Sequence, residues 1–273
     1  MVEETDPVEQ ISFLARSESR VRALERLLES GPTTQRELRT HLDASRSTIA
    51  RTLSALERRG WIEADDGAYR LTPVGTIVAR EFGELVDALR TTDELSTFLQ
   101  WFPYAEFDLE LRALRDATVT TSTSSDPYAP GRTQTELLRS ATRFRGFLPA
   151  IDLEGSEVVH EQITERDFAA EIVVSAGVGE TITTEEYADL FREQLATGQL
   201  TVLVYDGDLP FYLGLADDER VQIGVEDEEG FPRALLDTDT AAVREWAESV
   251  YDEYRTAARP KPSGKRWMRP SRS

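Results

Sequence analysis

The stretch Ser45–Thr72 reads SRSTIARTLSALERRGWIEADDGAYRLT. Ser45 is a residue type that caps helix N-termini, and the apolar residues after it recur at the spacing of one helical face. They are Ile49, Leu53 and Leu56. Gly60 ends this pattern, and apolar and polar residues then alternate around Asp66-Gly67, as is typical of a β-hairpin with a tight turn. We therefore expect a helix followed directly by a hairpin.

Two further helices are expected before this stretch. The segment RSESRVRALERLLESGP has an apolar stripe at helical spacing and closes at Gly31-Pro32. In the next segment, TTQRELRTHL, Thr34 and Glu37 have the spacing of a capping box. Three helices followed by a hairpin predict a winged helix-turn-helix domain over residues 16–72. Residues 73–101 continue as a linking helix with a broad apolar face, which would pack on the first helix or form the seam of a dimer. We favour the dimer.

Residues 102–258 alternate short apolar runs with amphipathic segments, such as AAEIVVS before TTEEYADLFREQLATG. Strand–helix–strand repetition of this kind predicts an α/β domain whose sheet is mainly parallel. Three consecutive strands near its end suggest an antiparallel extension. The fold class expected for the whole chain is α+β, with an N-terminal winged helix-turn-helix and a C-terminal α/β effector domain.

Charge is distributed unevenly along the 273 residues, whose net charge is -20. Residues 1–15 form an acidic segment, residues 16–60 carry a net charge of +4, and the tail 259–273 carries +6 and no periodic pattern. We expect this basic tail to be disordered. Only two of the 31 basic residues are lysine, as in the proteins of salt-accumulating halophiles. Molar salt would relieve the self-repulsion of so acidic a chain, because it shortens the Debye length to about 3 Å.

The predicted third helix and its surroundings supply side chains that suit double-stranded DNA. Arginine can bond both acceptors of a guanine edge, and serine and threonine hydroxyls can contact phosphates. We expect Arg46 and Arg51 to contact bases, and Ser45, Ser47, Thr48 and Thr34 to contact the backbone. The full set of candidate DNA-binding residues is Thr34, Ser45, Arg46, Ser47, Thr48, Ala50, Arg51, Ser54, Arg58 and Arg70. The wing is a weaker candidate, because acidic Asp65-Asp66 lie at its tip.

Two resemblances agree with this interpretation. Residues 16–76, with LSALERRGWIE and YRLTPVG, resemble the recognition helix and wing of archaeal and bacterial winged-helix regulators. The second domain, with LPFYLGLADDERVQIGVEDEEG and EWAESVYDEYRTAA, resembles effector domains of haloarchaeal two-domain regulators. It is similar to the domain of methanogenesis regulators and to the phospholipase-D-like sensor half of archaeal sugar regulators. The resemblance implies a transcriptional regulator of haloarchaeal type.

The sequence offers little for catalysis or metal binding. There is no cysteine, and neither His41 nor His160 lies in the His-x-Lys motif that phospholipase-D-like enzymes need. The acidic runs at 217–219 and 226–229 are expected to be solvated loops. We expect no enzyme activity, metal or cofactor. The alternatives are an α/β hydrolase or phosphodiesterase with an accessory winged helix, and an interaction scaffold.

The expected protein is thus a cytoplasmic, DNA-binding homodimer without membrane association. Its α/β domain would sense a small-molecule effector or a partner, and the ligand itself is not specified by the sequence. Candidate pocket segments are the Ser175–Glu180 loop, Tyr128 with Arg132, and the Tyr205–Tyr212 segment.

Overall fold

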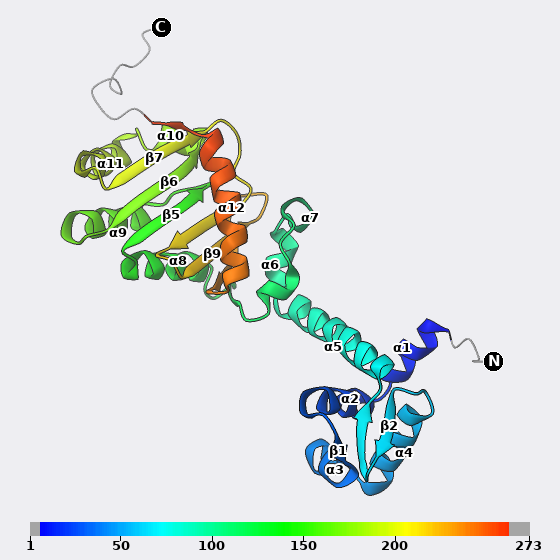
Figure 1. Ribbon diagram of the computed structural model, residues 1–273. Coiled ribbons are helices and arrows are strands. Elements are labelled where there is room, and N and C mark those ends of the chain that lie inside the picture. The colour runs from blue at the N-terminus through cyan, green and yellow to red at the C-terminus, as the bar shows by residue number, and fades with distance from the viewer. Residues whose placement is uncertain (1–5, 262–273) are drawn as a thin grey trace. The chain divides into compact units, whose positions relative to one another are not determined.

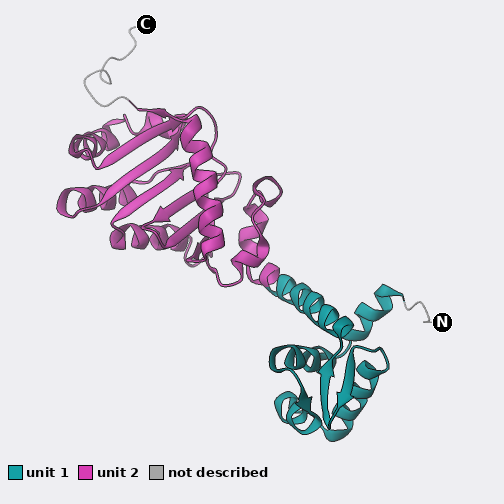
Figure 2. Ribbon diagram, in the orientation of Figure 1, with its two compact units in different colours: residues 1–90 teal, residues 91–273 magenta. Residues whose placement is uncertain are grey.

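The computed structural model describes residues 6–261, and the chain divides into two compact units, residues 1–90 and 91–273 (Figures 1 and 2). Unit 1 contains five helices and three strands in its described part. They are α1 (Pro7–Ala15), α2 (Glu18–Ser30), β1 (Thr33–Thr34), α3 (Gln35–Leu42), α4 (Arg46–Glu57), β2 (Ile62–Asp65), β3 (Ala68–Leu71) and α5 (Pro73–Glu94). The last helix runs a few residues past the boundary between the units.

The hairpin predicted around Asp66-Gly67 is present as β2 and β3, which pair antiparallel from Ile62↔Leu71 to Asp65↔Ala68. Asp66 and Gly67 both have positive φ, 47° and 80°. A two-residue turn of this kind matches the twist of the flanking strands, and glycine and aspartate accept its conformation at low cost. β1 adds a third strand on the other side of β3, with Thr33 opposite Tyr69.

The N-terminal segment, described from the sequence only as acidic, contains helix α1. Asp6 caps this helix by accepting a hydrogen bond from the Val8 N–H at 3.1 Å. Leu14 is buried in the same core as Ile49 and Leu56. Phe13 meets Trp61 edge to face at 5.7 Å. Helix α1 is therefore packed into unit 1.

Only part of the apolar face that the sequence predicts for helix α5 is buried in the structure. Ala79 is buried in the core of unit 1, and Val78 and Phe82 pack against that core. Four other apolar residues remain exposed on the same helix. These are Val74, Ile77, Leu85 and Leu89, with exposed fractions of 57%, 63%, 46% and 59%.

Gly75 determines how closely the start of α5 approaches the start of the wing. A Cβ atom at this position would lie 1.7 Å from the carbonyl oxygen of Trp61, and that oxygen already accepts a hydrogen bond from the Thr72 N–H at 3.0 Å. The neighbouring atoms belong to the Trp61 backbone, so no flexible side chain can move to make room for a Cβ atom. Only glycine fits this contact without a shift of the helix.

We therefore expect Gly75→Ala to lower the free energy of unfolding of unit 1 by about 3 kcal/mol, the upper range for overpacking a well-packed site. Gly83→Ala is the matched control in the same helix, because a Cβ there meets nothing within 4 Å. Alanine should stabilise that position by up to about 1 kcal/mol. Urea unfolding of both variants measures the difference, and equal stabilities would contradict the role assigned to Gly75.

Unit 2 consists of one eight-stranded sheet with helices on both faces (Figure 1). The strands are β4 (Thr118–Thr121), β5 (Arg143–Leu148), β6 (Ala169–Ser175), β7 (Leu200–Tyr205), β8 (Tyr212–Ala216), β9 (Arg220–Glu226), β10 (Pro232–Thr238) and β11 (Arg259–Pro260). The helices are α6 (Ser96–Trp101), α7 (Tyr104–Phe107), the 3-10 helix η1 (Leu111–Leu114), α8 (Ala129–Ser140), α9 (Leu153–Glu165), α10 (Ala176–Thr181), α11 (Glu185–Thr197) and α12 (Ala241–Ala257).

The prediction of a mainly parallel sheet is wrong, because the sheet is mixed. Its order is β11-β7-β6-β5-β8-β9-β10-β4, and only the pairs β5–β6 and β6–β7 are parallel. The strands β8, β9 and β10 follow one another through short turns, which can only join antiparallel neighbours. Helical crossovers are needed for parallel pairing, and among neighbouring strands of this sheet they connect only β5 to β6 and β6 to β7. The antiparallel extension seen in the sequence is thus the larger part of the sheet.

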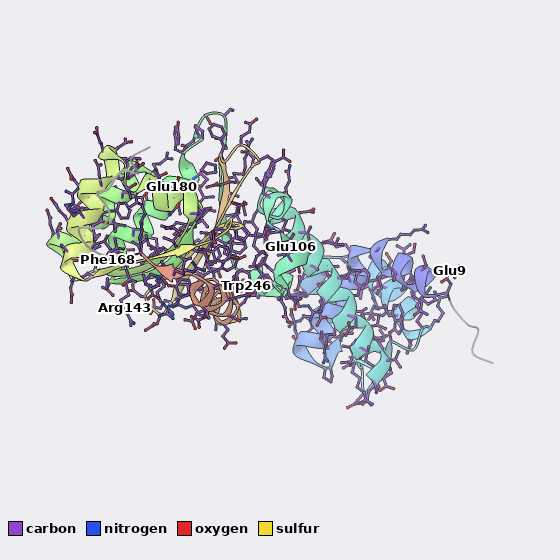
Figure 3. The ribbon with its side chains drawn as sticks, turned by 90° about the horizontal axis from the view of Figure 1, so that it is seen from above. Glu9, Glu106, Arg143, Phe168, Glu180 and Trp246 are labelled. Carbon is purple, nitrogen blue, oxygen red and sulfur yellow. The ribbon has the colours of Figure 1, made fainter. Side chains whose placement is uncertain are left out.

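Successive side chains of each strand point to opposite faces of the sheet, so the strands contribute to two hydrophobic cores, one on each face. On β5, Phe147 belongs to the core covered by α6 and α12, and Phe144 to the core covered by α8, α9 and α11. Trp246 of α12, labelled in Figure 3, donates a hydrogen bond from Nε1 to the Phe107 carbonyl at 2.7 Å. This bond fixes α12 to the segment that follows α6.

The predicted disordered tail begins within the sheet. Arg259 and Pro260 form β11, which pairs with Val204 and Leu203 of β7 at the sheet edge. Residues 262–273, the remainder of the predicted tail, lie outside the described residues, as do residues 1–5 of the acidic segment.

Asp217, in the turn between β8 and β9, ties this turn to the start of β5. Its Oδ1 accepts hydrogen bonds from the Thr142 N–H, the Thr142 hydroxyl and the Arg143 N–H at 3.0, 2.6 and 2.9 Å. Burial alone would raise the pKa of Asp217, but the hydrogen bonds from these three groups outweigh it and hold the pKa below its ordinary value.

Because the folded-state pKa of Asp217 is lowered, its stabilising effect is present above the ordinary aspartate pKa of about 3.9 and is lost as the pH falls through the folded-state value. We expect Asp217→Asn to cost about 1 kcal/mol at neutral pH and much less in strong acid. Urea unfolding at both pH values measures this. Asp218→Asn is the control, since its exposed carboxylate pairs with the exposed guanidinium of Arg143. A pH-independent loss for Asp217→Asn would contradict the assignment.

Candidate nucleic-acid interface

Helix α4 forms where the sequence predicts the third helix of the domain. The Ser45 hydroxyl accepts a hydrogen bond from the Thr48 N–H at 3.1 Å and so caps the helix. Ile49, Leu53 and Leu56 are buried in the core of unit 1. These contacts fix which face of α4 points inward and leave the opposite face exposed.

The exposed face of α4 brings together most of the candidate DNA-binding residues. They are Arg46, Ser47, Ala50, Arg51, Ser54 and Arg58. The Nε of Arg51 donates to the Ser47 carbonyl at 3.2 Å, and the Nε of Arg58 donates to the Ser54 carbonyl at 3.3 Å. Each guanidinium is thereby drawn back along the helix toward its N-terminus. The face presents three arginines and two small hydroxyls around Ala50.

Thr34 and Ser45 have structural partners that the sequence only partly indicated. Thr34 forms a complete capping box with Glu37, as predicted from their spacing. These hydrogen bonds from the Thr34 backbone and side chain lower the pKa of Glu37. The Ser45 hydroxyl lies 3.0 Å from the Ser47 hydroxyl and 2.9 Å from that of Thr48. The hydroxyls at the start of α4 therefore form one cluster at the helix N-terminus.

The connection between α3 and α4 is short and bent. Asp43 adopts the left-handed conformation at φ 46°, and the Ala44 N–H bonds to the Arg39 carbonyl at 3.3 Å. A left-handed residue ends a helix and redirects the chain, and aspartate tolerates this conformation better than most residues. This turn sets α4 at an angle to α3.

Arg70 lies on β3 of the wing and has acidic partners. Its guanidinium pairs with Glu63 at 2.9 Å and with Asp65 at 3.6 Å. The two carboxylates neutralise the arginine within the wing.

Unit 2 contains a cavity at a place that the sequence analysis did not select. It lies among α8, α9, α11 and the strands β5 to β7, and Gln194 of α11 is among its lining residues. The three predicted pocket segments do not line it. Tyr128 is exposed, and Arg132 is paired with Asp126. One signal was available in the sequence, because Gln194 is a polar residue three positions after Phe191 on the buried face of α11.

No group of three or more His, Asp or Glu side chains suited to a metal ion occurs among residues 6–261. His160 lies on α9, where its Nε2 is 3.5 Å from Glu193. In the same part of the chain, no helix is long and apolar enough to cross a membrane.

A helix-turn-helix with a wing, followed by an α/β unit, defines the class of regulator-like two-domain proteins. Comparison with known families agrees with this class. Residues 8–94 match the family model of the HVO_A0261 N-terminal domain, and residues 127–257 match that of the middle domain of the methanogenesis regulatory protein FilR1. The two models fall on the two units in turn, and the chain is a two-domain protein of regulator type.

Several solved structures are similar at low identity. TrmBL2, an archaeal chromatin protein, is 16% identical over 94% of this chain and 100% of its own, with a TM-score of 0.42. Nuc from Salmonella typhimurium, a phospholipase D family member, is 12% identical over 54% of this chain and 100% of its own, and its TM-score is also 0.42. No curated protein sequence matches the chain. The class therefore rests on the two family models.

Proposed function

We propose that this protein is a DNA-binding transcriptional regulator whose helix α4 reads the major groove. The observation that carries the proposal is the exposed face of α4, where Arg46, Arg51 and Arg58 lie along a helix held by the buried residues of its opposite face. Recognition helices of winged-helix and helix-turn-helix domains present their N-terminal residues to base edges. The FilR1 regulator model over unit 2 supports the same conclusion.

Roles are assigned within this interface by chemistry and position. Arg46 and Arg51, in the first half of α4, are proposed to contact bases, since a guanidinium can bond two acceptors of guanine. Ser47 and the cluster of hydroxyls around Ser45 are proposed to contact phosphates near the helix N-terminus, where the helix dipole favours anions. The wing contributes little base contact in this proposal, because Arg70 is paired with two carboxylates.

We further propose that the protein acts as a homodimer through α5. The four exposed apolar residues Val74, Ile77, Leu85 and Leu89 fall within about one third of the circumference of the helix. An exposed apolar stripe on a long helix is covered at low cost by the same stripe of a second copy. Two copies would place two α4 helices on half-sites about 34–36 Å apart, as symmetric operators require.

Adaptation to high salt is the proposed reason why so acidic a protein binds a polyanion. Residues 61–258 carry a net charge of -26, while residues 16–60 carry +4. Salt screens the repulsion between the acidic part and DNA, and it also reduces the counterion release on which phosphate contacts depend. Binding in molar salt would then rest mainly on base contacts and groove fit.

This proposal predicts that the protein is more stable in molar KCl than at low salt, because screening removes self-repulsion of the folded state. Thermal unfolding followed by circular dichroism over a KCl series measures the effect. A melting temperature that falls or stays constant as KCl rises would contradict salt adaptation without affecting the DNA interface.

The proposal assigns no catalytic role to unit 2, and it places the protein in the cytoplasm with the genome. His160 has Gln162, not lysine, two positions later, and its ring contacts Glu193. The sequence therefore lacks the His-x-Lys motif on which a phospholipase-D-like phosphodiesterase would depend.

Selection of bound fragments from fragmented genomic DNA in molar KCl tests the proposed function. The expected result is one inverted repeat recovered by the natural protein and lost in Arg51→Ala. Recovery of the same fragments by both proteins, or of no common sequence, would overturn the proposal that α4 reads DNA.

A further inference from the structure

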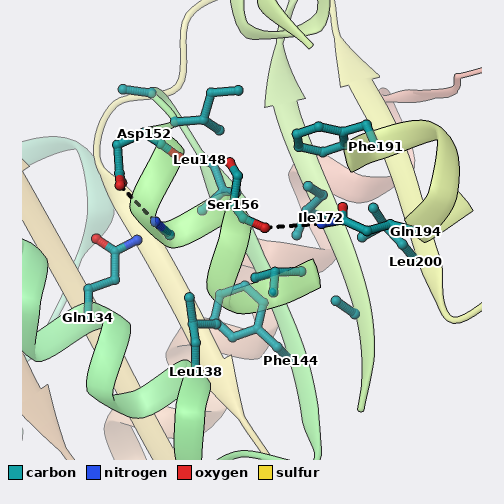
Figure 4. A pocket seen from close by; sticks show the side chains of 15 residues that line it. Gln134, Leu138, Phe144, Leu148, Asp152, Ser156, Ile172, Phe191, Gln194 and Leu200 are labelled. Atoms are coloured by element: carbon teal, nitrogen blue, oxygen red, sulfur yellow. Dashed lines mark hydrogen bonds between the residues drawn. The ribbon is translucent and has the colours of Figure 1, made fainter. Parts of the chain in front are cut away.

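A cavity of about 60 Å³ lies beneath helix α9 in unit 2 (Figure 4). Its walls are apolar side chains of α8, β5, β6, α11 and β7. They include Leu138, Phe144, Ile172, Phe191 and Leu200. Most of these walls belong to the core that α8, α9 and α11 form with the sheet, so the space is fixed by well-packed elements.

Gln194 places one polar group among these apolar walls. Its side chain is 0% exposed, and its Nε2 donates to the Ser156 carbonyl at 3.1 Å (Figure 4). Its Oε1 is buried and accepts no hydrogen bond from any of residues 6–261. Because the Ser156 carbonyl can only accept, this bond fixes which end of the amide is the oxygen. A buried acceptor without a donor is costly, so it selects a ligand that brings a donor.

The polar residues that line the cavity besides Gln194 are Gln134, Asp152 and Ser156, and of these Asp152 alone is charged. The carboxylate of Asp152 caps α9 by accepting from the Gly155 N–H at 2.8 Å, and Asp152 is exposed. Among residues 6–261, no lysine, arginine or histidine lines the cavity. A carboxylate or phosphate ligand would therefore meet an acceptor and a negative charge with no compensating cation. A cationic ligand would lose its hydration in the apolar cavity, and the exposed, water-screened carboxylate of Asp152 would compensate only a small part of that cost.

The volume limits the part of a ligand that can be enclosed. A dry cavity of roughly 150 Å³ holds a benzene molecule, and one ordered water needs roughly 10–15 Å³. The cavity beneath α9 is therefore large enough for about two to four non-hydrogen atoms. Any larger remainder would extend outward past the exposed Asp152.

We infer that this cavity is a binding site for a small neutral molecule with an apolar body and a hydroxyl group, which donates to Oε1 of Gln194. The apolar body lies against Phe144, Ile172 and Phe191. The site itself is independent of DNA binding, and only its role as the effector site of a regulator rests on the proposed function. In that role, occupancy would order the start of α9 against α11, the two helices that Ser156 and Gln194 join.

The test uses propan-1-ol as the probe and the full chain in molar KCl. Assigned backbone amide signals of Gly155 and Gln194 are followed by nuclear magnetic resonance during titration. We expect saturable shifts at both signals with propan-1-ol, and none with propanoate or propylammonium at equal concentration. No saturable shift with propan-1-ol, or equal shifts with propanoate, would overturn the inference.

Two variants test separately the hydrogen bond from the ligand to Gln194 and the open volume of the cavity. Gln194→Leu should weaken propan-1-ol binding at least about tenfold, because the acceptor is lost. Gln162→Leu makes the same change at a buried glutamine of α9 that does not line the cavity, and it should bind normally. Val159→Phe fills the cavity from a half-buried position and keeps Gln194, so it should abolish binding if the first variant fails to fold. Unchanged binding by Gln194→Leu or by Val159→Phe would overturn the site.

Addition of propan-1-ol to the complex with a recovered DNA fragment tests the effector role separately. A change in DNA affinity that is absent in Val159→Phe supports the role, and an unchanged affinity with saturable shifts overturns the role alone. Saturable shifts in a protein that binds no DNA would contradict the proposed function but support the binding site. DNA binding by a protein that shows no saturable shifts with propan-1-ol would contradict the binding site but not the proposed function.

Discussion

Arg51→Ala is expected to weaken sequence-specific DNA binding about 10- to 100-fold for each half-site. A bidentate contact between arginine and guanine contributes about 1–3 kcal/mol, and each 1.4 kcal/mol corresponds to a factor of ten. The side chain is exposed on α4, and its hydrogen bond to the Ser47 carbonyl is local to the helix, so its removal should leave the fold intact. Fluorescence anisotropy with a recovered operator, in molar KCl, measures the loss.

Arg90→Ala is the matched control for this measurement. Arg90 lies on α5, is exposed, and pairs with Asp87 three residues earlier, so its loss removes the same charge away from α4. Binding by this variant should stay within a factor of about two, because a screened distant charge contributes little at high ionic strength. Equal losses in both variants would mean that only net charge matters, and the base contact assigned to Arg51 would be wrong.

Ile77→Asp is expected to convert the dimer to a monomer. Ile77 is 63% exposed, the most exposed residue of the apolar stripe on α5, and a carboxylate there would be buried against the apolar stripe of the second copy. Burying an unpaired charge in an interface costs several kcal/mol, enough to shift a dissociation constant by a factor of about 100 or more. Sedimentation equilibrium of the natural chain and the variant gives their masses.

Phe231→Asp controls for the added charge and the lost apolar area. Phe231 is 61% exposed, in the turn before β10 of unit 2. This variant should remain a dimer. A natural chain that sediments as a monomer, or a dimer that survives Ile77→Asp, would contradict the α5 interface. Loss of operator binding by the monomeric Ile77→Asp variant would link the dimer to DNA recognition.

Local patterns in the sequence were enough to predict helices α2, α3 and α4, the hairpin of β2 and β3, and the exposed face of α4. Ser45 and Thr34 cap the helices that they were expected to cap, and Asp66-Gly67 forms the turn of the wing. The buried and exposed faces of α4 follow from residue spacing alone, since side chains three and four positions apart share one side of a helix. Helix α1 was not predicted from its acidic composition, although Asp6-Pro7 is a typical helix start.

The broad apolar face predicted for α5 shows where periodicity stops being informative. Periodicity identifies apolar positions, but it does not tell which of them meet a neighbouring element. Ala79 is buried in the core of unit 1 and Phe82 packs against it, whereas Ile77 and Leu89 are exposed. That division depends on the direction in which the wing and α1 pack, which no local pattern specifies.

The sequence by itself determined the three helices and the hairpin of residues 16–72, their caps and turn, and the arginine-bearing face of α4, because these depend on neighbours along the chain. The tertiary structure alone decided the mixed sheet, the closeness of Gly75 to Trp61, and the cavity at Gln194. Strand direction is set by which strands become neighbours, and a cavity is set by how helices from distant segments meet over a sheet. Both are contacts between residues far apart in the chain, so the sequence contains them only through the packing of the whole unit.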